Sequence, residues 1–334
     1  MQEYEKNILG KYNIDVNSTR KVRGAVLCDT AQGIFLLREV SVPEARTSVL
    51  CALYDHLKEQ GYPNVDELAA NRNGEYVTVG EDGKRYMLRR WFRARECDLR
   101  KPSELLLASG NLAKLHGMMH MEIPEAVETE SLSEEYERHN RELRKVRKFV
   151  RAMTSKGEFE TVFLKHFDEM YQWTQVAELL LSKSGYKRLR SRSREERGLV
   201  HGEYNYHNIL MKNEETYGGS ELAATVNFDK FRQDIQVEDL YYFLRKVMEK
   251  HGWKERLGDS MLNAYSAIKP LSEEETEYLK LRFLYPEKFW KIANTYYHSN
   301  KAWIPVKNIE KLHMAIRQTK EKERFINNIF SSHL

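Results

Sequence analysis

Short apolar runs broken by turn residues dominate the first part of the chain. A tight turn at Gln32-Gly33 joins two such runs, which is the pattern of a β-hairpin, and residues 81–84 form a second turn signal. Between these turns, apolar residues recur at helical spacing after Pro43 and end before Gly61, which predicts one amphipathic helix. The four strands are expected over residues 24–29, 34–39, 75–79 and 85–91.

After about residue 100 the apolar residues recur every three or four positions, which is the period of an α-helix. Helices are expected over residues 105–119, 136–153 and 159–181, and again from Val237 to the end of the sequence. Between Ser191 and Asp229 this pattern is interrupted by extended pieces at 198–200, 209–211 and 223–228. The order favours one bilobal unit with a crevice between a strand-rich and a helical part.

Composition narrows the class of protein without naming a function. The chain has 54 basic and 50 acidic residues and a net charge of +4, so we expect neither a nucleic acid nor an anionic membrane as partner. Its 3 cysteines lack paired CxxC spacing, and no signal-like start or apolar run of about 18 residues is present. These features predict a globular protein made in the cytoplasm. The basic run over residues 187–197 is interpreted as a solvated loop, with an anion-binding surface as the alternative.

The segment that carries chemistry is His201-Gly202-Glu203-Tyr204-Asn205-Tyr206-His207-Asn208, and Asn227-Phe228-Asp229 follows it along the chain. Phosphoryl transfer needs a carboxylate near the acceptor hydroxyl, an amide oxygen on Mg²⁺, and a further carboxylate that bridges the metal to the phosphates. The spacing from His201 through Glu203 to Asn208 matches the kinase pattern, in which an Asp occupies the third position. Without a kinase function, Asn227 and Asp229 would be an ordinary turn at a strand end, and His201 a buried scaffold residue.

With these motifs the chain resembles the aminoglycoside-phosphotransferase and choline-kinase branch of the protein-kinase-like superfamily, and within it the CotS-type spore coat proteins. The resemblance covers nearly the whole sequence. Besides the loop, it rests on residues 86–91, 95–98, 112–116, Asp239-Leu240 and 285–290.

The resemblance implies an α+β, bilobal protein-kinase-like fold: a small antiparallel-sheet lobe with one helix over residues 1–92, and a mostly α-helical lobe over 93–334. It implies a crevice for ATP and Mg²⁺ after Trp91, a location in the endospore coat, and other coat proteins as partners. The resemblance assigns a catalytic role to Glu203 and Asn208. It assigns metal binding to Asn208, Asn227 and Asp229. The residues it assigns to nucleotide binding are Arg38, Glu44, Met87 and Arg89.

Three departures from the kinase pattern decide the expected function. Arg38 stands where the family has a phosphate-binding lysine, Glu203 is one methylene longer than the usual Asp, and Asn227 lacks the charge of the usual metal ligand. We therefore expect a structural coat protein or pseudokinase that binds ATP and Mg²⁺ weakly or not at all. The alternative is an active ATP-dependent kinase that phosphorylates a small-molecule hydroxyl, with Glu203 as base and Asn208 and Asp229 on the metal.

Overall fold

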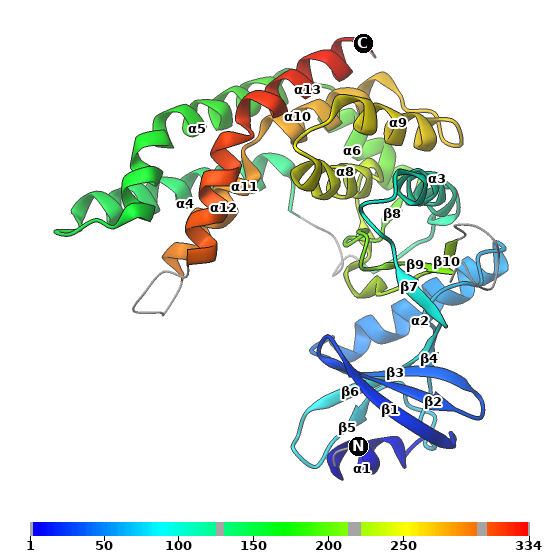
Figure 1. The fold of residues 1–334 in the computed structure, drawn as a ribbon. Coiled ribbons are helices and arrows are strands. Elements are labelled where there is room, and N and C mark those ends of the chain that lie inside the picture. The colour runs from blue at the N-terminus through cyan, green and yellow to red at the C-terminus, as the bar shows by residue number, and fades with distance from the viewer. Residues whose placement is uncertain (1–2, 125–129, 213–221, 299–305, 333–334) are drawn as a thin grey trace. The chain divides into compact units, whose positions relative to one another are not determined.

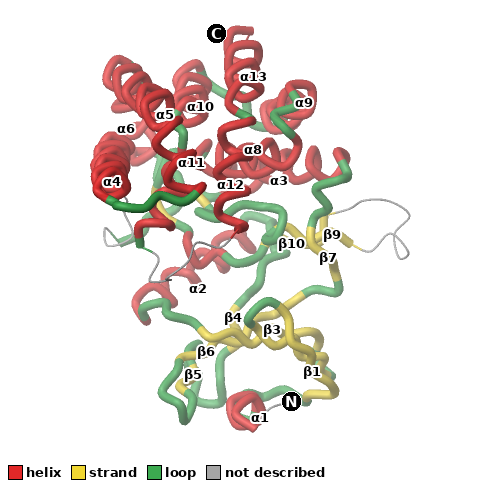
Figure 2. The backbone as a smooth tube through the Cα atoms, turned by 60° about the vertical axis from the view of Figure 1, so that its left-hand side comes forward, coloured by secondary structure: helices red, strands yellow, loops and turns green. Residues whose placement is uncertain are grey.

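The computed structural model describes residues 3–124, 130–212, 222–298 and 306–332. The chain forms two compact units, residues 1–125 with 197–232 and residues 126–196 with 233–334. The first unit contains an antiparallel sheet, and the second is built from helices (Figure 2). This confirms the α+β class. The lobe boundaries expected over 1–92 and 93–334 stay a prediction. The two units are defined by which residues pack together, and this does not test where a lobe begins or ends.

The first unit begins with a six-stranded antiparallel sheet in the order β1-β2-β3-β6-β4, with β5 paired to β6. Its strands are β1 (Val16–Val22), β2 (Ala25–Thr30), β3 (Gly33–Glu39), β4 (Leu68–Ala69), β5 (Thr78–Val79) and β6 (Arg85–Trp91). The hairpin expected at Gln32-Gly33 is confirmed by the pairing of Thr30 with Gly33. The strand expected over 75–79 is shorter, because Asn71 accepts hydrogen bonds from the backbone of Asn73 and Glu75 and holds that segment as a turn.

Strand alternation gives this sheet two different faces. One face carries Val26, Leu37 and Leu88, which pack with Ile8 and Leu9 of the short helix α1 (Glu3–Leu9), visible at the N-terminal end in Figure 1. The sequence did not predict α1.

The register determines which candidate residues share the other face. Leu36 pairs with Arg89, and Arg38 pairs with Met87. Because side chains of directly paired residues lie on the same face of a sheet, these four point to the same side.

Helices and short strands complete the first unit. They are α2 (Glu44–Glu59), β7 (Ala94–Glu96), α3 (Pro102–Met118), β8 (Leu199–Val200), β9 (Ile209–Lys212), β10 (Leu222–Thr225), the 3-10 turn η2 (Phe228–Lys230) and β11 (Arg232–Gln233). The helix predicted after Pro43 is α2, and its apolar residues Leu50, Leu53 and Leu57 are buried. Strands β10, β9 and β7 form a three-stranded sheet that presents the loop between β8 and β9.

The second unit consists of helices whose apolar faces pack on one another. They are α4 (Leu132–Ala152), α5 (Glu158–Lys183), α6 (Tyr186–Glu195), α8 (Val237–His251), α9 (Glu255–Ser266), α10 (Glu273–Leu284), α11 (Glu287–Tyr297), α12 (Val306–Arg317) and α13 (Thr319–Ser332). No helix in the described ranges is long and apolar enough to cross a membrane.

The prediction of a loop over the basic run 187–197 is wrong for most of that range, because α6 extends to Glu195. Tyr186, Leu189 and Ser193 repeat at helical spacing and are buried, so the helix has an inner face despite its many arginines. On its outer side Arg188 and Arg192 form ion pairs with Glu274 of α10.

A buried ion cluster joins the sheet to the chain segment after β10. Arg89 on β6 is 0% exposed and donates a hydrogen bond of 2.9 Å to Asp66, whose side chain is also 0% exposed. Nη2 of the same guanidinium forms an ion pair with the Asp229 carboxylate. Asp66 further accepts hydrogen bonds from the Tyr54 hydroxyl at 2.9 Å and the Asn227 backbone N–H at 3.0 Å.

Burial alone would lower the pKa of Arg89, but Asp66, Tyr54 and Asp229 together raise it above its ordinary value. The cation is therefore permanent, and each of its carboxylate partners depends on it. Since Asp66 precedes β4 and Asp229 follows β10, this cluster holds the segment around Asn227 against the sheet.

Replacing Arg89 by Met should destabilise the protein strongly. The change removes the cation from two carboxylates, and breaking a buried pair on one side costs about 3–5 kcal/mol. Urea unfolding would measure the loss of unfolding free energy. The matched control is Arg90→Met on the exposed neighbouring position of β6, which should change stability by no more than about 0.5 kcal/mol.

A double variant separates lost charge from lost packing. Adding Asp66→Asn to Arg89→Met should cost less than the sum of the two single changes, because the second substitution removes a charge that the first left unpaired. Strict additivity, or a loss below about 1 kcal/mol for Arg89→Met, would contradict the role assigned to this cluster.

Candidate functional site

The loop over residues 201–208 is held by backbone hydrogen bonds and by helix α3. His201 Nδ1 accepts from the Glu203 backbone N–H at 3.1 Å, so Nε2 carries the proton that it donates to the Val226 carbonyl at 3.0 Å. The hydroxyl of Tyr204 donates to the Ala108 carbonyl of α3 at 2.7 Å. His201 is thus a scaffold residue, as one interpretation of the sequence expected.

Gly202 allows this loop to approach the end of η2. Its φ is +82°, and a Cβ at this position would lie 2.1 Å from the Lys230 carbonyl oxygen. Any other residue would clash there and would also be strained by its positive φ, so the loop requires glycine.

A chain of hydrogen bonds runs from β3 to the loop through the side chain of Asn227. Arg38 Nη1 donates to Asn227 Oδ1 at 2.8 Å, and Asn227 Nδ2 donates to Asn208 Oδ1 at 2.7 Å. Asn208 Nδ2 then donates to the Glu203 carbonyl at 2.9 Å. An arginine has no acceptor and a carbonyl has no donor, so the two ends of the chain determine the orientation of both amides.

The backbone of Asn227 adopts a conformation that few residue types enter readily. Its φ is 66° and its ψ is 53°, in the left-handed region. Asn and Asp enter this region more readily than other side chains with a Cβ. An unusual backbone angle of this kind is typical of functional sites.

Glu203, the candidate base, lines the same cavity but has a partner. Its Oε1 lies 2.7 Å from Lys230 Nζ, and these side chains are 37% and 63% exposed. An acceptor hydroxyl would have to compete with Lys230 for this carboxylate, although a pair this exposed is weak.

These residues surround a cavity of about 630 Å³ in the first unit. That volume falls within the range of small-molecule and cofactor sites. Leu27, Leu36, Trp91 and Leu210 provide an apolar part. The polar lining consists of Arg20, Arg23, Arg38, Glu96, Glu203, His207, Asn208, Asn227 and Asp229.

The polar lining combines fixed cations with the amide chain. Burial and the neighbouring Arg89 lower the pKa of Arg38, while Asp229, Asp66 and Glu203 oppose that shift. Arginine nonetheless stays protonated in proteins, so Arg38 is a cation facing the cavity.

The turn between β1 and β2 reaches the loop at one side of the cavity. Arg23 lies 3.3 Å from Glu96, and Nδ1 of His207 lies 2.6 Å from both Arg23 Nη1 and Glu96 Oε2. Gly24, with φ of 72°, provides the left-handed residue of this turn. The turn consists of this one glycine and Arg23, which directly follows β1.

The structure brings together most of the residues that the sequence selected. Arg38, Glu203, Asn208, Asn227 and Asp229 all line the one cavity.

The other candidates for nucleotide binding lie elsewhere. Met87 and Arg89 are fully buried and do not line the cavity, although Arg89 reaches it through Asp229. Glu44 begins α2, and its side chain lies outside the described residues.

Sequence reasoning missed Asp66 and Lys230. No local pattern identifies Asp66, since it precedes a strand of only two residues and meets Arg89 through the fold. Lys230 carried a weak signal, because it directly follows Asp229 in the metal-type segment.

The donor set does not fit a kinase magnesium site. Mg²⁺ prefers carboxylate and phosphate oxygens. Here Asn208 Oδ1 already accepts from an N–H, Asn227 Oδ1 is bound by a cation, and the Asp229 carboxylate is paired with Arg89. Within the described ranges no group of three or more His, Cys, Asp or Glu side chains could hold a metal ion.

The comparison with solved structures confirms the kinase-like fold. An aminoglycoside phosphotransferase from Alicyclobacillus acidocaldarius superimposes with a TM-score of 0.85 at 15% identity, covering 98% of this chain and 96% of that one. Spectinomycin phosphotransferase APH(9)-Ia, solved with ADP and spectinomycin, has a TM-score of 0.65 at 10% identity and covers 95% of this chain and 97% of that one.

Sequence comparison identifies the family. Spore coat protein S of Bacillus subtilis (strain 168) is 22% identical over 344 residues, which span 98% of this chain and 95% of that protein. The family described as "Spore coat putative kinase YutH" matches residues 5–329. The expected spore coat family is confirmed: this chain belongs to the kinase-like spore coat proteins of the YutH family.

Proposed function

We propose that this protein is a structural component of the endospore coat whose kinase-type cavity binds a nucleotide such as ATP without transferring its phosphoryl group at kinase rates. Family membership supports the coat location, and other coat proteins are the expected partners. One alternative is retained, an active phosphotransferase in which Glu203 accepts the proton of a small-molecule hydroxyl.

The observation that carries the proposal is the hydrogen bond from Asn227 Nδ2 to Asn208 Oδ1, at 2.7 Å. In a kinase the side chains at these two positions present oxygens to each other, and Mg²⁺ lies between them. Here the amide N–H of Asn227 takes the place of the ion, because it donates directly to the oxygen of Asn208. The positive charge near the phosphates is then provided by arginine.

The cavity suits a nucleotide by size and by charge. Its apolar part, with Trp91 at the end of β6, could hold a planar base, and Arg20, Arg23 and Arg38 could neutralise phosphates. The structure of spectinomycin phosphotransferase with ADP shows that a protein of this fold binds an adenine nucleotide.

Phosphoryl transfer needs more than binding. The acceptor must be positioned against a base, and the developing charge on the phosphoryl oxygens must be stabilised at the same time. Glu203 is one methylene longer than the usual Asp, and a misplacement of about 1 Å can cost roughly a hundredfold in rate. Asn227 also lacks the charge of the usual metal ligand. Both changes weaken stabilisation of the same transition state.

Magnesium should leave nucleotide binding to the wild-type protein unchanged and should become necessary in Asn227→Asp. Thermal unfolding with ATP, in EDTA or in excess Mg²⁺, would measure this. A ligand at ten times its dissociation constant stabilises by about 1.4 kcal/mol, so the wild-type shift should be modest and equal in both conditions. In Asn227→Asp an oxygen replaces the bridging N–H, and a cation is then required between two oxygens.

The control for the arginine contribution is Arg38→Met, which should abolish the ATP shift, whereas Arg90→Met on the exposed position of β6 should keep it. A wild-type shift that grows with Mg²⁺ as much as that of Asn227→Asp would refute the amide bridge.

Restoring all three kinase residues together should restore turnover. We expect the triple variant Arg38→Lys, Glu203→Asp, Asn227→Asp to hydrolyse ATP slowly in the presence of Mg²⁺, while each single change has little effect. The non-additivity follows from a shared transition state, since a metal ligand is of limited use while the base is misplaced. A coupled assay of ADP release would measure it.

Wild-type phosphorylation of a small molecule at roughly 1–100 per second would instead favour the active kinase. A triple variant that binds ATP and Mg²⁺ but remains inert would show that acceptor binding has been lost as well.

A further inference from the structure

A second cavity lies in the helical unit, apart from the nucleotide-type site. It has a volume of about 50 Å³ and is lined by side chains from α5, α8, α10, α11, α12 and α13 and from segments between helices. Water needs about 10–15 Å³ of such space per molecule, so the cavity could hold a few waters or one small polyatomic group. It is too small for a nucleotide.

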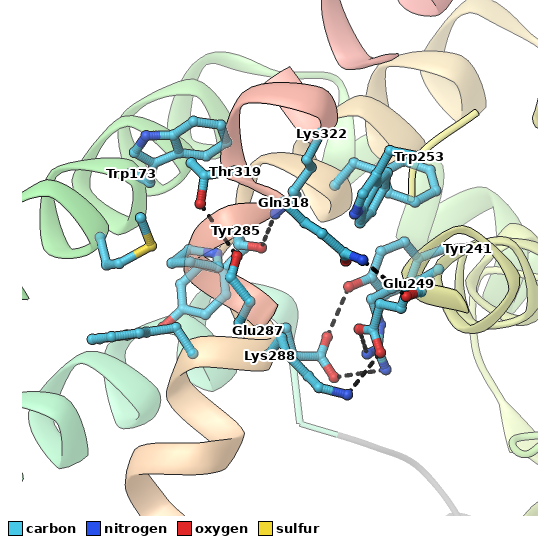
Figure 3. Close-up of a pocket in the computed structure, with 16 residues that line it drawn as sticks. Trp173, Tyr241, Glu249, Trp253, Tyr285, Glu287, Lys288, Gln318, Thr319 and Lys322 are labelled. Atoms are coloured by element: carbon cyan, nitrogen blue, oxygen red, sulfur yellow. Dashed lines mark hydrogen bonds and ion pairs between the residues drawn. The ribbon is translucent and has the colours of Figure 1, made fainter. Parts of the chain in front are cut away.

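Lys322 of α13 contributes an ammonium group to this cavity. Figure 3 shows its side chain between Trp173 and Trp253, and the two indole centroids lie 5.3 and 5.8 Å from Nζ. Nζ donates to the Tyr285 carbonyl at 3.1 Å. A lysine ammonium has three N–H donors, and among the described residues this carbonyl is the only hydrogen-bond acceptor in contact with it.

The neighbouring carboxylates are already neutralised. Glu249 is bound by Arg245 at 2.7 Å and by Lys288 at 2.8 Å. Glu287 accepts from Lys291 at 2.7 Å and from the Tyr241 hydroxyl at 2.8 Å. Lys322 is therefore the cation of this cluster that has no carboxylate within ion-pair distance in the described ranges.

Arg245 provides further unused donors. Its side chain is only 6% exposed and lines the cavity, yet Nε and Nη2 have no hydrogen-bond partner. Nη2 lies 3.2 Å from Glu287, an ion-pair distance without hydrogen-bond geometry. Buried donors in native proteins almost always have a partner, so these atoms indicate a missing acceptor.

We propose that this cavity binds a small tetrahedral oxyanion, sulfate or phosphate, which accepts hydrogen bonds from Lys322 and Arg245. The lining charges are those of Arg245, Lys288 and Lys322 against Glu249 and Glu287, an excess of one positive charge that favours an anion. The two indole rings lie beside Nζ of Lys322 and add an apolar wall to the cavity.

The protonation of Lys322 gives the site a characteristic pH dependence. Burial lowers the pKa of Lys322 to about 7, against the opposing effects of Glu249 and Glu287. A bound anion favours the protonated amine. Affinity should therefore be highest below pH 7 and should fall as pH rises above it.

The two carboxylates that face Lys322 do not titrate in this range. Burial would raise the pKa of Glu249, but Arg245 and Lys288 lower it below its ordinary value. Burial likewise opposes ionisation of Glu287, whose pKa is held well below its ordinary value by Arg245 and Lys291. Arg245 and Lys288 complete the charged lining from α8 and α11, and α5 contributes only Met170 and Trp173.

Calorimetric titration of the full chain with sulfate, at ionic strength held constant with chloride, tests the site. Sulfate keeps its charge between pH 6.5 and 8.5, so any change belongs to the protein. We expect one saturable site whose affinity is roughly twentyfold weaker at pH 8.5 than at pH 6.5, since binding that requires a protonated amine loses about tenfold per pH unit above its pKa. Lys322→Met should abolish binding, and Lys320→Met, an exposed lysine on the same helix, should leave it unchanged.

A measurement on the wild-type protein covers the case in which Lys322→Met fails to fold. Amine acylation at pH 8, located by mass spectrometry, should label Lys322 less in sulfate than in chloride, because a protonated amine is not a nucleophile, while Lys320 should be labelled equally. The proposal is overturned if no saturable sulfate binding occurs at pH 6.5, if folded Lys322→Met binds as well as wild type, or if sulfate leaves Lys322 labelling unchanged.

Discussion

The buried contact of Arg89 with Asp66 and Asp229 is the interaction on which the cavity of the first unit depends. It connects the central strand β6, the approach to β4 and the segment after β10 within one hydrogen-bonded cluster. Asp66 also binds the backbone N–H of Asn227, so the cluster orients the residue whose side chain organises the site. Arg89 in this place pairs with one oxygen of the Asp229 carboxylate, a side chain that also lines the cavity.

Beside this cluster, hydrogen bonds from an amide and an arginine connect the side chains that a metal ion connects in a kinase. Where a metal would bridge an amide oxygen and a carboxylate, the Asn227 amide bridges Asn208 directly, and Arg38 binds the oxygen left over. The arrangement is self-consistent, because the amide donors of Asn227 and Asn208 each meet an acceptor. Under the proposed function, such a cavity holds a phosphate group without polarising it for transfer. A structural coat protein would need the folded chain and its surface for contacts with other proteins, but not phosphoryl transfer.

Much of this could be predicted from the sequence where the signal was local. Apolar alternation and turn residues located β2, β3 and α2, and the spacing from His201 to Asn208 located the loop. The partners of Arg89 could not be predicted, because they depend on contacts between distant segments. The helix α6 was missed because its charges conceal the spacing of Tyr186, Leu189 and Ser193. The Lys322 cavity could not be predicted, because it depends on the packing of several helices that are distant in the sequence.

The most direct test of the account is a crystal structure of the wild-type protein grown with ATP and Mg²⁺. The account predicts that nucleotide phosphates contact Arg38, that Asn227 Nδ2 still donates to Asn208, and that neither Asn208 nor Asp229 coordinates a metal ion. A Mg²⁺ ion coordinated by Asn208 and Asp229, with Arg89 displaced from that carboxylate, would contradict it and would favour an active kinase.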